Sequence, residues 1–356
     1  MSGSQTRFSG LRIFLGGIMV DFRYHLVSLG AVFIALAVGI ILGAGPLQNS
    51  IGNVLNSQVQ ALSEANSRLK NETSELRKSI AQQEAAWTDV APTLVSGTLT
   101  GRSVAIVALP GTNTEQIVAT TERLTQAGAS VNMQVTLNNV WTAADQTAYR
   151  TTFASQLASY IEGAEQGADA NTMMADALRQ LTVKGTGFGQ NATLRDIFTG
   201  SERPMMTIAV TNEAEAQAVV FIAPDTDQAE IDKKAAKNSE VQAQATYDAQ
   251  TYAELAARFA KHIPTVVAGV ADSPADVARV VRDAGSASTV DNLNESLAIG
   301  TVNVVMAVAA ELNDSLVHLG FDDGAGAPLS PRVESVKPAD NPPAAGEAPA
   351  QEQPAA

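Results

Sequence analysis

An uninterrupted apolar segment near the N-terminus constrains this chain more than any other feature. No charged residue occurs from Leu26 to Ser63, and residues 26–47 are almost wholly apolar. About 20 consecutive apolar residues form a helix long enough to cross roughly 30 Å of hydrocarbon. We therefore predict a single transmembrane helix over residues 26–47.

Basic residues set the expected orientation of this helix. Arg7, Arg12 and Arg23 precede it, and Asp21 is the only acid among them. Because positive charge is retained on the cytoplasmic side, residues 1–25 are predicted to be cytoplasmic and the rest extracytoplasmic. The predicted location is the inner (plasma) membrane, crossed once.

A cleavable signal peptide is the alternative interpretation of the same segment. Its apolar region would be about 7–15 residues long, which is shorter than the one observed. Pro46 also follows Ala44 and Gly45 directly, and this disfavours cleavage there. We predict that the anchor is retained. Met19 is a second possible start of the chain, and the sequence leaves that choice open.

Small residues recur along the predicted transmembrane helix. They occupy every fourth position, at Ala31, Ala35, Gly39 and Gly43. Such a row lets two helix backbones approach closely, although Gly and Ala are frequent in membrane helices anyway. Together with the segment that follows, the row predicts contact with a second copy of the chain.

Residues 48–91 follow the heptad pattern of a coiled coil. Leucines occupy one core position, and a mixed set that includes one asparagine occupies the other, with Gln83 and Trp87 continuing the pattern. The two sets are Leu55, Leu62, Leu69 and Leu76, then Val59, Asn66, Thr73 and Ile80. Leucine at the first position favours two strands, and a single Asn at the second fixes the register of parallel dimers. We predict a parallel homodimer. The alternative is a long solvated helix that packs on the chain's own domain.

Residues 101–320 alternate strand-like and helix-like patterns, which predicts an extracytoplasmic α/β domain. Strand, helix and strand over residues 104–137 form one βαβ unit, and this unit implies a parallel, Rossmann-like sheet. Strands are predicted at 104–109, 131–137, 205–210, 217–223 and 264–270, and helices at 114–126, 143–162, 170–183, 246–261, 274–284 and 295–312.

Several segments around this domain have separate predictions. Pro92 is expected to end the stalk. Residues 184–189 are predicted to form a flexible loop, and residues 229–244 a solvated loop or hairpin. Residues 296–310 lack charge but are too short for a second span, so we predict a buried helix. Residues 321–356 are rich in Pro, Ala, Gly and Glu, which predicts a disordered acidic tail.

Composition excludes several functional classes. The chain has 37 acidic and 23 basic residues, a formal net charge of −14, and this disfavours nucleic acid as a partner. It has no cysteine and three histidines, which leaves little material for thiol chemistry, His-based catalysis or a zinc site. No G-x-S-x-G, H-E-x-x-H or P-loop motif is present. We predict that the chain is not an enzyme and binds no cofactor.

Two weaker candidate sites remain open. The turn at residues 109–114 could present helix N-terminal amides to an anion, or it could be an ordinary capped turn. Asp225 and Asp227 follow a predicted strand and could bind a hard cation, or they could cap the next helix. The paired methionines Met173–Met174 and Met205–Met206 are interpreted as core residues.

The run of residues 20–29, which leads into the anchor, resembles the start of the mycobacterial copper transport protein B family. Its key residues are Asp21, Arg23, Tyr24 and His25, and a second, weaker match is Ser288-Thr289-Val290-Asp291-Asn292 before the last long helix. The family belongs to actinobacteria with a mycolic-acid envelope. The resemblance implies copper export or homeostasis through the envelope, with a role as an outer-membrane pore.

The resemblance also implies a second kind of role. Members in corynebacteria are linked to cell separation, where the membrane protein works with a cytoplasmic partner and influences a peptidoglycan hydrolase outside. A dimeric anchor, a coiled-coil stalk and a non-catalytic domain fit such a scaffold. We expect a scaffold that binds cell-envelope and cell-separation proteins, with copper transport as the alternative.

Overall fold

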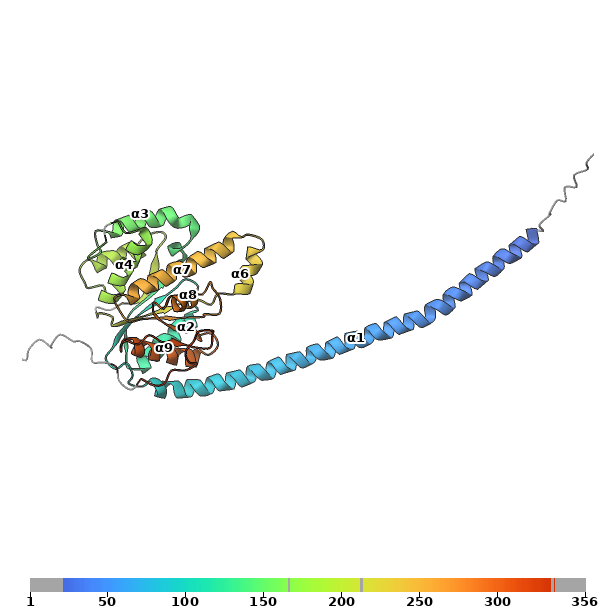
Figure 1. The fold of residues 1–356 in the computed structure, drawn as a ribbon, viewed down its shortest axis with the longest axis horizontal. Coiled ribbons are helices and arrows are strands. Elements are labelled where there is room, and N and C mark those ends of the chain that lie inside the picture. Colours follow the sequence, from blue (N-terminus) through green and yellow to red (C-terminus); the bar gives the residue numbers. More distant parts are fainter. Residues whose placement is uncertain (1–21, 166, 212–213, 334–335, 337–356) are drawn as a thin grey trace, which may run out of the picture. The chain divides into compact units, whose positions relative to one another are not determined.

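A computed structural model describes residues 22–165, 167–211, 214–333 and 336. The chain divides after Ser79 into two compact units. One continuous helix, α1 (Phe22–Val95), fills the described part of the first unit and continues into the second (Figure 1). Within it, Phe22–Gly43 is apolar and long enough to span a membrane, with a mean hydropathy of 2.6 and no buried residue. The predicted apolar N-terminal helix is therefore confirmed.

Helix α1 does not end at Pro92, so that prediction is wrong. The helix continues to Val95, and the backbone N–H of Ser96 still reaches the Pro92 carbonyl at 3.0 Å. Proline removes only one helical hydrogen bond here, in the last turn of the helix. Gly97, with a φ of +76°, then lets the chain leave the helix.

The second unit contains a seven-stranded sheet in the order β3-β2-β1-β4-β5-β6-β7. Neighbouring strands are parallel, except that β3 is antiparallel to β2. The strands are β1 (Ser103–Ala108), β2 (Ser130–Leu137), β3 (Met206–Thr211), β4 (Ala218–Ile222), β5 (Thr265–Ala268), β6 (Ser288–Val290) and β7 (His318–Leu319). The predicted parallel α/β architecture is confirmed. Since the chain winds outward in both directions from β1 and β4, the switch point lies between these two strands.

Helices cover both faces of this sheet (Figure 1). One apolar core joins the sheet to α3 (Thr147–Leu157), α4 (Ala170–Lys184), α5 (Asn191–Thr199), α7 (Glu240–Ala260) and α8 (Val277–Ala284). The other core joins it to α2 (Thr114–Gln126), α9 (Leu297–Glu311) and the last turns of α1. All six residues of β1 are buried because both faces are covered. Helix α9 is thus the buried helix that was predicted.

Sequence patterns missed several elements, including the 3-10 helix at Asn139–Trp141, and misread one segment. The α-helices and strands not predicted are α5, β6, β7 and α6 (Gln228–Ala235). Residues 229–244, predicted to be a loop or hairpin, instead form most of α6 and the start of α7. None of the α6 residues is buried, so no apolar stripe marks this helix. Strands β6 and β7 are too short for a periodic signal.

The predicted tail begins too early in the chain. Phe321 donates its backbone N–H to Asp291 at 2.6 Å, and Leu329, Val333 and Val336 pack against the second core. Residues 321–333 therefore belong to the α/β domain. Averaging composition over a Pro- and Ala-rich stretch hid these apolar anchors. The remainder of the predicted tail, residues 334, 335 and 337–356, lies outside the described residues.

Candidate functional site

The residues predicted to form a dimer contact all lie on α1, and the described ones face solvent. Gly39 and Gly43 have open space where a Cβ would stand. Ala31 and Ala35 are exposed as well, in the same apolar segment. The stalk residues Leu55, Val59, Leu62, Asn66, Leu69, Thr73, Leu76 and Ile80 are likewise exposed. Both sets of residues are thus exposed on α1, and their pairing stays a prediction.

The residues of the family motif separate into two places. Asp21 lies outside the described residues, and Arg23, Tyr24 and His25 are exposed at the start of α1. In contrast, Asp291 and Asn292 are completely buried, directly after β6. The two parts of the motif therefore serve different purposes. The second part organises the interior of the α/β domain.

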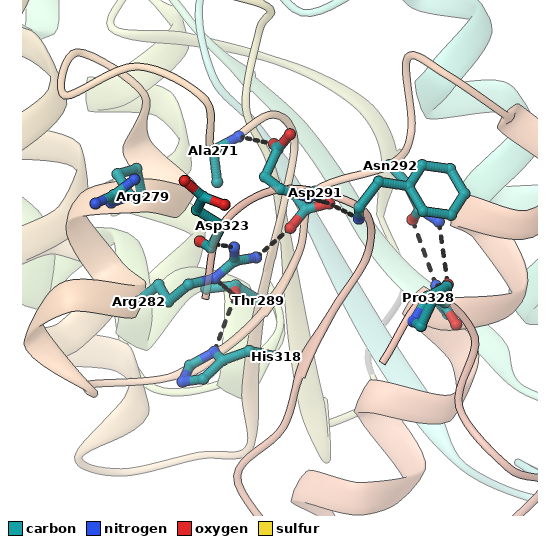
Figure 2. Close-up of polar contacts among 12 residues, drawn as sticks. Ala271, Arg279, Arg282, Thr289, Asp291, Asn292, His318, Asp323 and Pro328 are labelled. Carbon is teal, nitrogen blue, oxygen red and sulfur yellow. Dashed lines mark hydrogen bonds and ion pairs between the residues drawn. The ribbon is translucent and has the colours of Figure 1, made fainter. Parts of the chain in front are cut away.

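Asp291 is the centre of a buried polar network (Figure 2). The guanidinium of Arg282, on α8, contacts one carboxylate oxygen of Asp291 at 2.5 Å, and both side chains are almost inaccessible to solvent. Arg282 also donates to the Thr289 hydroxyl at 3.0 Å and to the Asp323 carbonyl at 3.1 Å. His318 Nδ1 lies 2.9 Å from that same hydroxyl. Such a pair is tolerated in a core because its remaining donors find partners.

The other Asp291 oxygen holds the chain after β7. It accepts backbone N–H groups from Phe321, at 2.6 Å, and from Asp322, at 3.3 Å. The Asp322 carboxylate in turn accepts the backbone N–H of Ala271 at 2.8 Å. Gly320 has a φ of +138°, and a Cβ at this position would overlap the Asp291 carboxylate. The network therefore fixes the turn that leads into the C-terminal segment.

Two buried asparagines continue this role further along the segment. Asn303, on α9, donates to the Pro328 carbonyl at 2.8 Å and accepts the Ser330 N–H at 3.1 Å. Asn292 lies within 3.5 Å of the same carbonyl. A single parallel β-bridge joins Ala327 to Leu319, and the asparagine contacts hold the residues that follow it. Asp291 and Asn292 are thus positioning residues for the C-terminal segment.

A cavity of about 370 Å³ opens at the switch point between β1 and β4. Its lining comes from the loops after β1, β2 and β4 and from α6 and α7; it includes Pro110, Thr142, Asp225, Asp227, Asp248 and Tyr252. Ligands of doubly wound sheets bind at this place. Here, however, the carboxylates give the lining a negative charge, which opposes nucleotide phosphates and other anions.

The two weaker candidate sites both lie at this edge of the sheet. Asn113 accepts the backbone N–H of Glu115 at 2.9 Å, so the turn before α2 is a capped turn. Asp227 caps α6 by accepting the N–H of Glu230 at 2.9 Å. Asp225 is exposed as a residue, but its carboxyl has lost part of its contact with water. This desolvation, together with the negative charges of Asp272 and Asp227, raises the pKa of the carboxyl. The described residues hold no cluster of three or more His, Asp or Glu side chains suited to a metal.

Another carboxyl at the same edge is buried. Asp276, directly before α8, accepts the backbone N–H of Ser273 at 2.8 Å and is 1% exposed. Burial raises the pKa of Asp276 to about 7, and the neighbouring Asp272 adds to this effect. Asp276 therefore retains a proton over much of the acidic range, unlike an ordinary aspartate.

Methionine and histidine side chains do not gather in the described structure as a copper site would require. Met174, Met205 and Met206 are completely buried in the first core, and Met173 is half-buried against it. This confirms that the paired methionines are core residues. His318 is bound to Thr289, while His262 is exposed at the end of α7.

One helix of membrane-spanning length in the described part of the chain, followed by a doubly wound α/β domain, indicates a membrane protein. The sequence profile of the family described as "Copper transport outer membrane protein, MctB" matches residues 19–330. The chain therefore belongs to the MctB family. Two curated relatives are named Copper transporter MctB, from Mycobacterium tuberculosis and Mycobacterium bovis. Each is 32% identical over 127 residues, which cover 36% of this chain and 40% of the relative.

Sequence reasoning found the stalk stripe and, through the family resemblance, Asp291 and Asn292. It missed Arg282, Gly320 and Asn303, which complete the buried network. Arg282 lies on an amphipathic helix, where an arginine is normally interpreted as solvent-exposed. Its buried partner Asp291 follows β6, which is too short to show a periodic pattern in the sequence. At position 320, the sequence sign of an unusual backbone conformation was the glycine itself, directly before Phe321.

Proposed function

We propose that this protein is a membrane-anchored, non-enzymatic scaffold that pairs in parallel through its stalk and binds cell-envelope and cell-separation proteins. The observation that carries the proposal is the exposed leucine stripe. Leu55, Leu62, Leu69 and Leu76 are 58%, 72%, 58% and 64% exposed on one continuous helix. Fully burying one such side chain is worth roughly 1.5–3 kcal/mol. A stripe of this length at heptad spacing suits a second, identical helix.

The membrane anchor explains why the pairing is parallel. Two copies inserted in the same membrane with the same orientation send their stalks away from it in the same direction. Leucines of equal number then meet, and so do the Asn66 side chains, which can hydrogen-bond across the seam. Glu72 and Arg77 occupy flanking positions where charges of opposite sign pair between chains. A slip by one heptad would place one Asn66 opposite Val59 and the other opposite Thr73, and the contact between the two asparagines would be lost.

The partners follow from the expected orientation. The basic N-terminus faces a cytoplasmic partner, while the stalk and α/β domain lie outside and bind envelope proteins such as a regulated peptidoglycan hydrolase. The acidic surface of the chain supports basic partners rather than nucleic acid. In this proposal the α/β domain acts by binding and catalyses no reaction.

Charge placed in the seam tests the scaffold. The double variant Leu62→Glu and Leu69→Glu should convert the full-length chain in detergent from dimer to monomer, because four carboxylates would face each other across the seam. The measurement is mass by light scattering. Ser67→Glu with Ser74→Glu adds the same charge outside the seam and should remain dimeric.

In cells, the seam variant should produce chains of unseparated cells, and the copper tolerance of these cells should be normal. Separated cells with reduced copper tolerance would contradict the proposal.

Copper transport is the second candidate, supported by the family description and by the names of the two mycobacterial relatives. We expect the scaffold to show no stoichiometric copper binding, because most of the paired methionine side chains are enclosed in the core. Titration of the full-length chain with copper(I) and copper(II), followed by calorimetry, tests this. Tight binding that is lost in Met173→Leu with Met174→Leu, or in Met205→Leu with Met206→Leu, would favour transport.

A further inference from the structure

The base of helix α1, residues 80–95, has one face in the α/β domain. Ala91 and Val95 are completely buried in the second core, beside Leu99. Glu84 lies on the same side of the helix. Its two carboxylate oxygens accept the Ser296 hydroxyl at 2.5 Å and the Ala298 backbone N–H at 2.7 Å. These contacts fix the helix base against the start of α9 and set its rotation about its own axis.

A second face of the same helix base remains uncovered. The heptad register of the stalk continues through Ile80, Gln83 and Trp87 to Val90. Ile80 and Val90 are 58% and 47% exposed, and Trp87 is half-buried. Large apolar side chains therefore face solvent within one turn of side chains that are completely buried. The domain covers one side of this helix and reaches Leu94, the next heptad position, but it leaves Ile80 and Val90 exposed.

We propose that a second copy of the chain covers this face, so that the dimer seam continues from the stalk onto the base of the α/β domain. The inference rests on the parallel pairing proposed above. The register is the reason for choosing a second copy as the occupant, because equal residues of two parallel chains meet at every heptad position. Ala86, which flanks the seam, is small and lets the helices approach beside the domain.

The rotation set by Glu84 then decides where the two domains lie. At 100° per residue, the face with Glu84, Ala91 and Val95 lies about a quarter turn from the seam. A twofold axis along the seam relates the two copies. The two domains therefore lie on opposite sides of the paired helices rather than stacked on each other. Each leaves its switch-point edge free for other partners.

Single cysteines test the proposal cleanly, because the natural chain has none. Full-length Val90→Cys and Ile80→Cys proteins in native membranes should form disulfide-linked dimers on oxidation with diamide. Their yield should match that of Leu62→Cys in the stalk. Ala85→Cys, exposed on the same helix but off the seam, is the matched control and should crosslink at least ten times less. Tryptophan fluorescence of each variant checks that the domain is folded.

The outcomes separate this inference from the scaffold itself. Crosslinking at Leu62→Cys without crosslinking at Val90→Cys would overturn the inference and leave the stalk dimer standing. Loss of crosslinking at all three seam positions would overturn both. Equal crosslinking at Val90→Cys and Ala85→Cys would show random collision and would also overturn it.

Discussion

Replacing Arg282 by alanine is expected to lower the free energy of unfolding of the α/β domain by about 3–5 kcal/mol. The substitution would leave the Asp291 carboxylate buried without its cation, at a position where both side chains have almost no contact with water. It also removes the donors to Thr289 and Asp323. Urea denaturation of the full-length chain in detergent measures the change, with buried Trp141 as the fluorescent reporter.

Arg279 supplies the matched control for that experiment. It lies on the same helix, one turn earlier, and pairs with Asp283 at 2.9 Å on the surface. Water replaces a lost surface partner at little cost, so Arg279→Ala should leave the denaturation midpoint nearly unchanged. Equal losses in the two variants would mean that helix α8 itself, rather than the buried pair, determines stability.

Replacing Gly320 by alanine should cost at least about 3 kcal/mol, the upper end for a strained backbone position. A Cβ at this residue would overlap the Asp291 carboxylate, which cannot move without breaking its bond to Arg282. The backbone φ of +138° is also unfavourable for any residue with a side chain. We expect the chain after β7 to detach, and trypsin to cut at Arg332 faster than in the natural protein.

The variant Gly285→Ala is the control that distinguishes steric overlap of a new Cβ from backbone strain. Gly285 ends helix α8 in the left-handed conformation and has no heavy atom within 4 Å of a built Cβ. Its substitution should cost only about 1–2 kcal/mol, the usual penalty for that conformation. If Gly320→Ala were no more destabilising than Gly285→Ala, the close approach of Gly320 to Asp291 would be without energetic importance.

Local patterns predicted the parts of the fold that have periodicity. The apolar segment before residue 47 and the βαβ unit at 104–137 were visible, because their signals extend over many residues. Helix α6 was not visible, since it buries no residue and thus has no apolar stripe. The C-terminal segment was misjudged because Leu329 and Val333 are isolated apolar residues in a Pro- and Ala-rich stretch.

The candidate sites divide in the same way, into residues that follow a periodic pattern and residues that are joined only by long-range contacts. The stalk stripe follows directly from heptad spacing, whereas the contacts of Glu84 join positions more than 200 residues apart. The heptad pattern gives no sign of these contacts. The family motif named Asp291 and Asn292, but only the tertiary structure shows that they hold the C-terminal segment. Long-range polar contacts carry no periodic signal in a single sequence.

The two ends of the α/β domain are attached on the same side of its sheet. The last turns of α1 pack into one core with Leu329, Val333 and Val336, and Arg332 donates to the Ser96 carbonyl at 2.8 Å. A pulling force applied between the base of α1 and Arg332 would therefore enter and leave the domain through that one layer. The layer of α3, α4, α5 and α7 belongs to the other core and carries neither attachment point. A partner bound there could stay in place while the envelope is under tension.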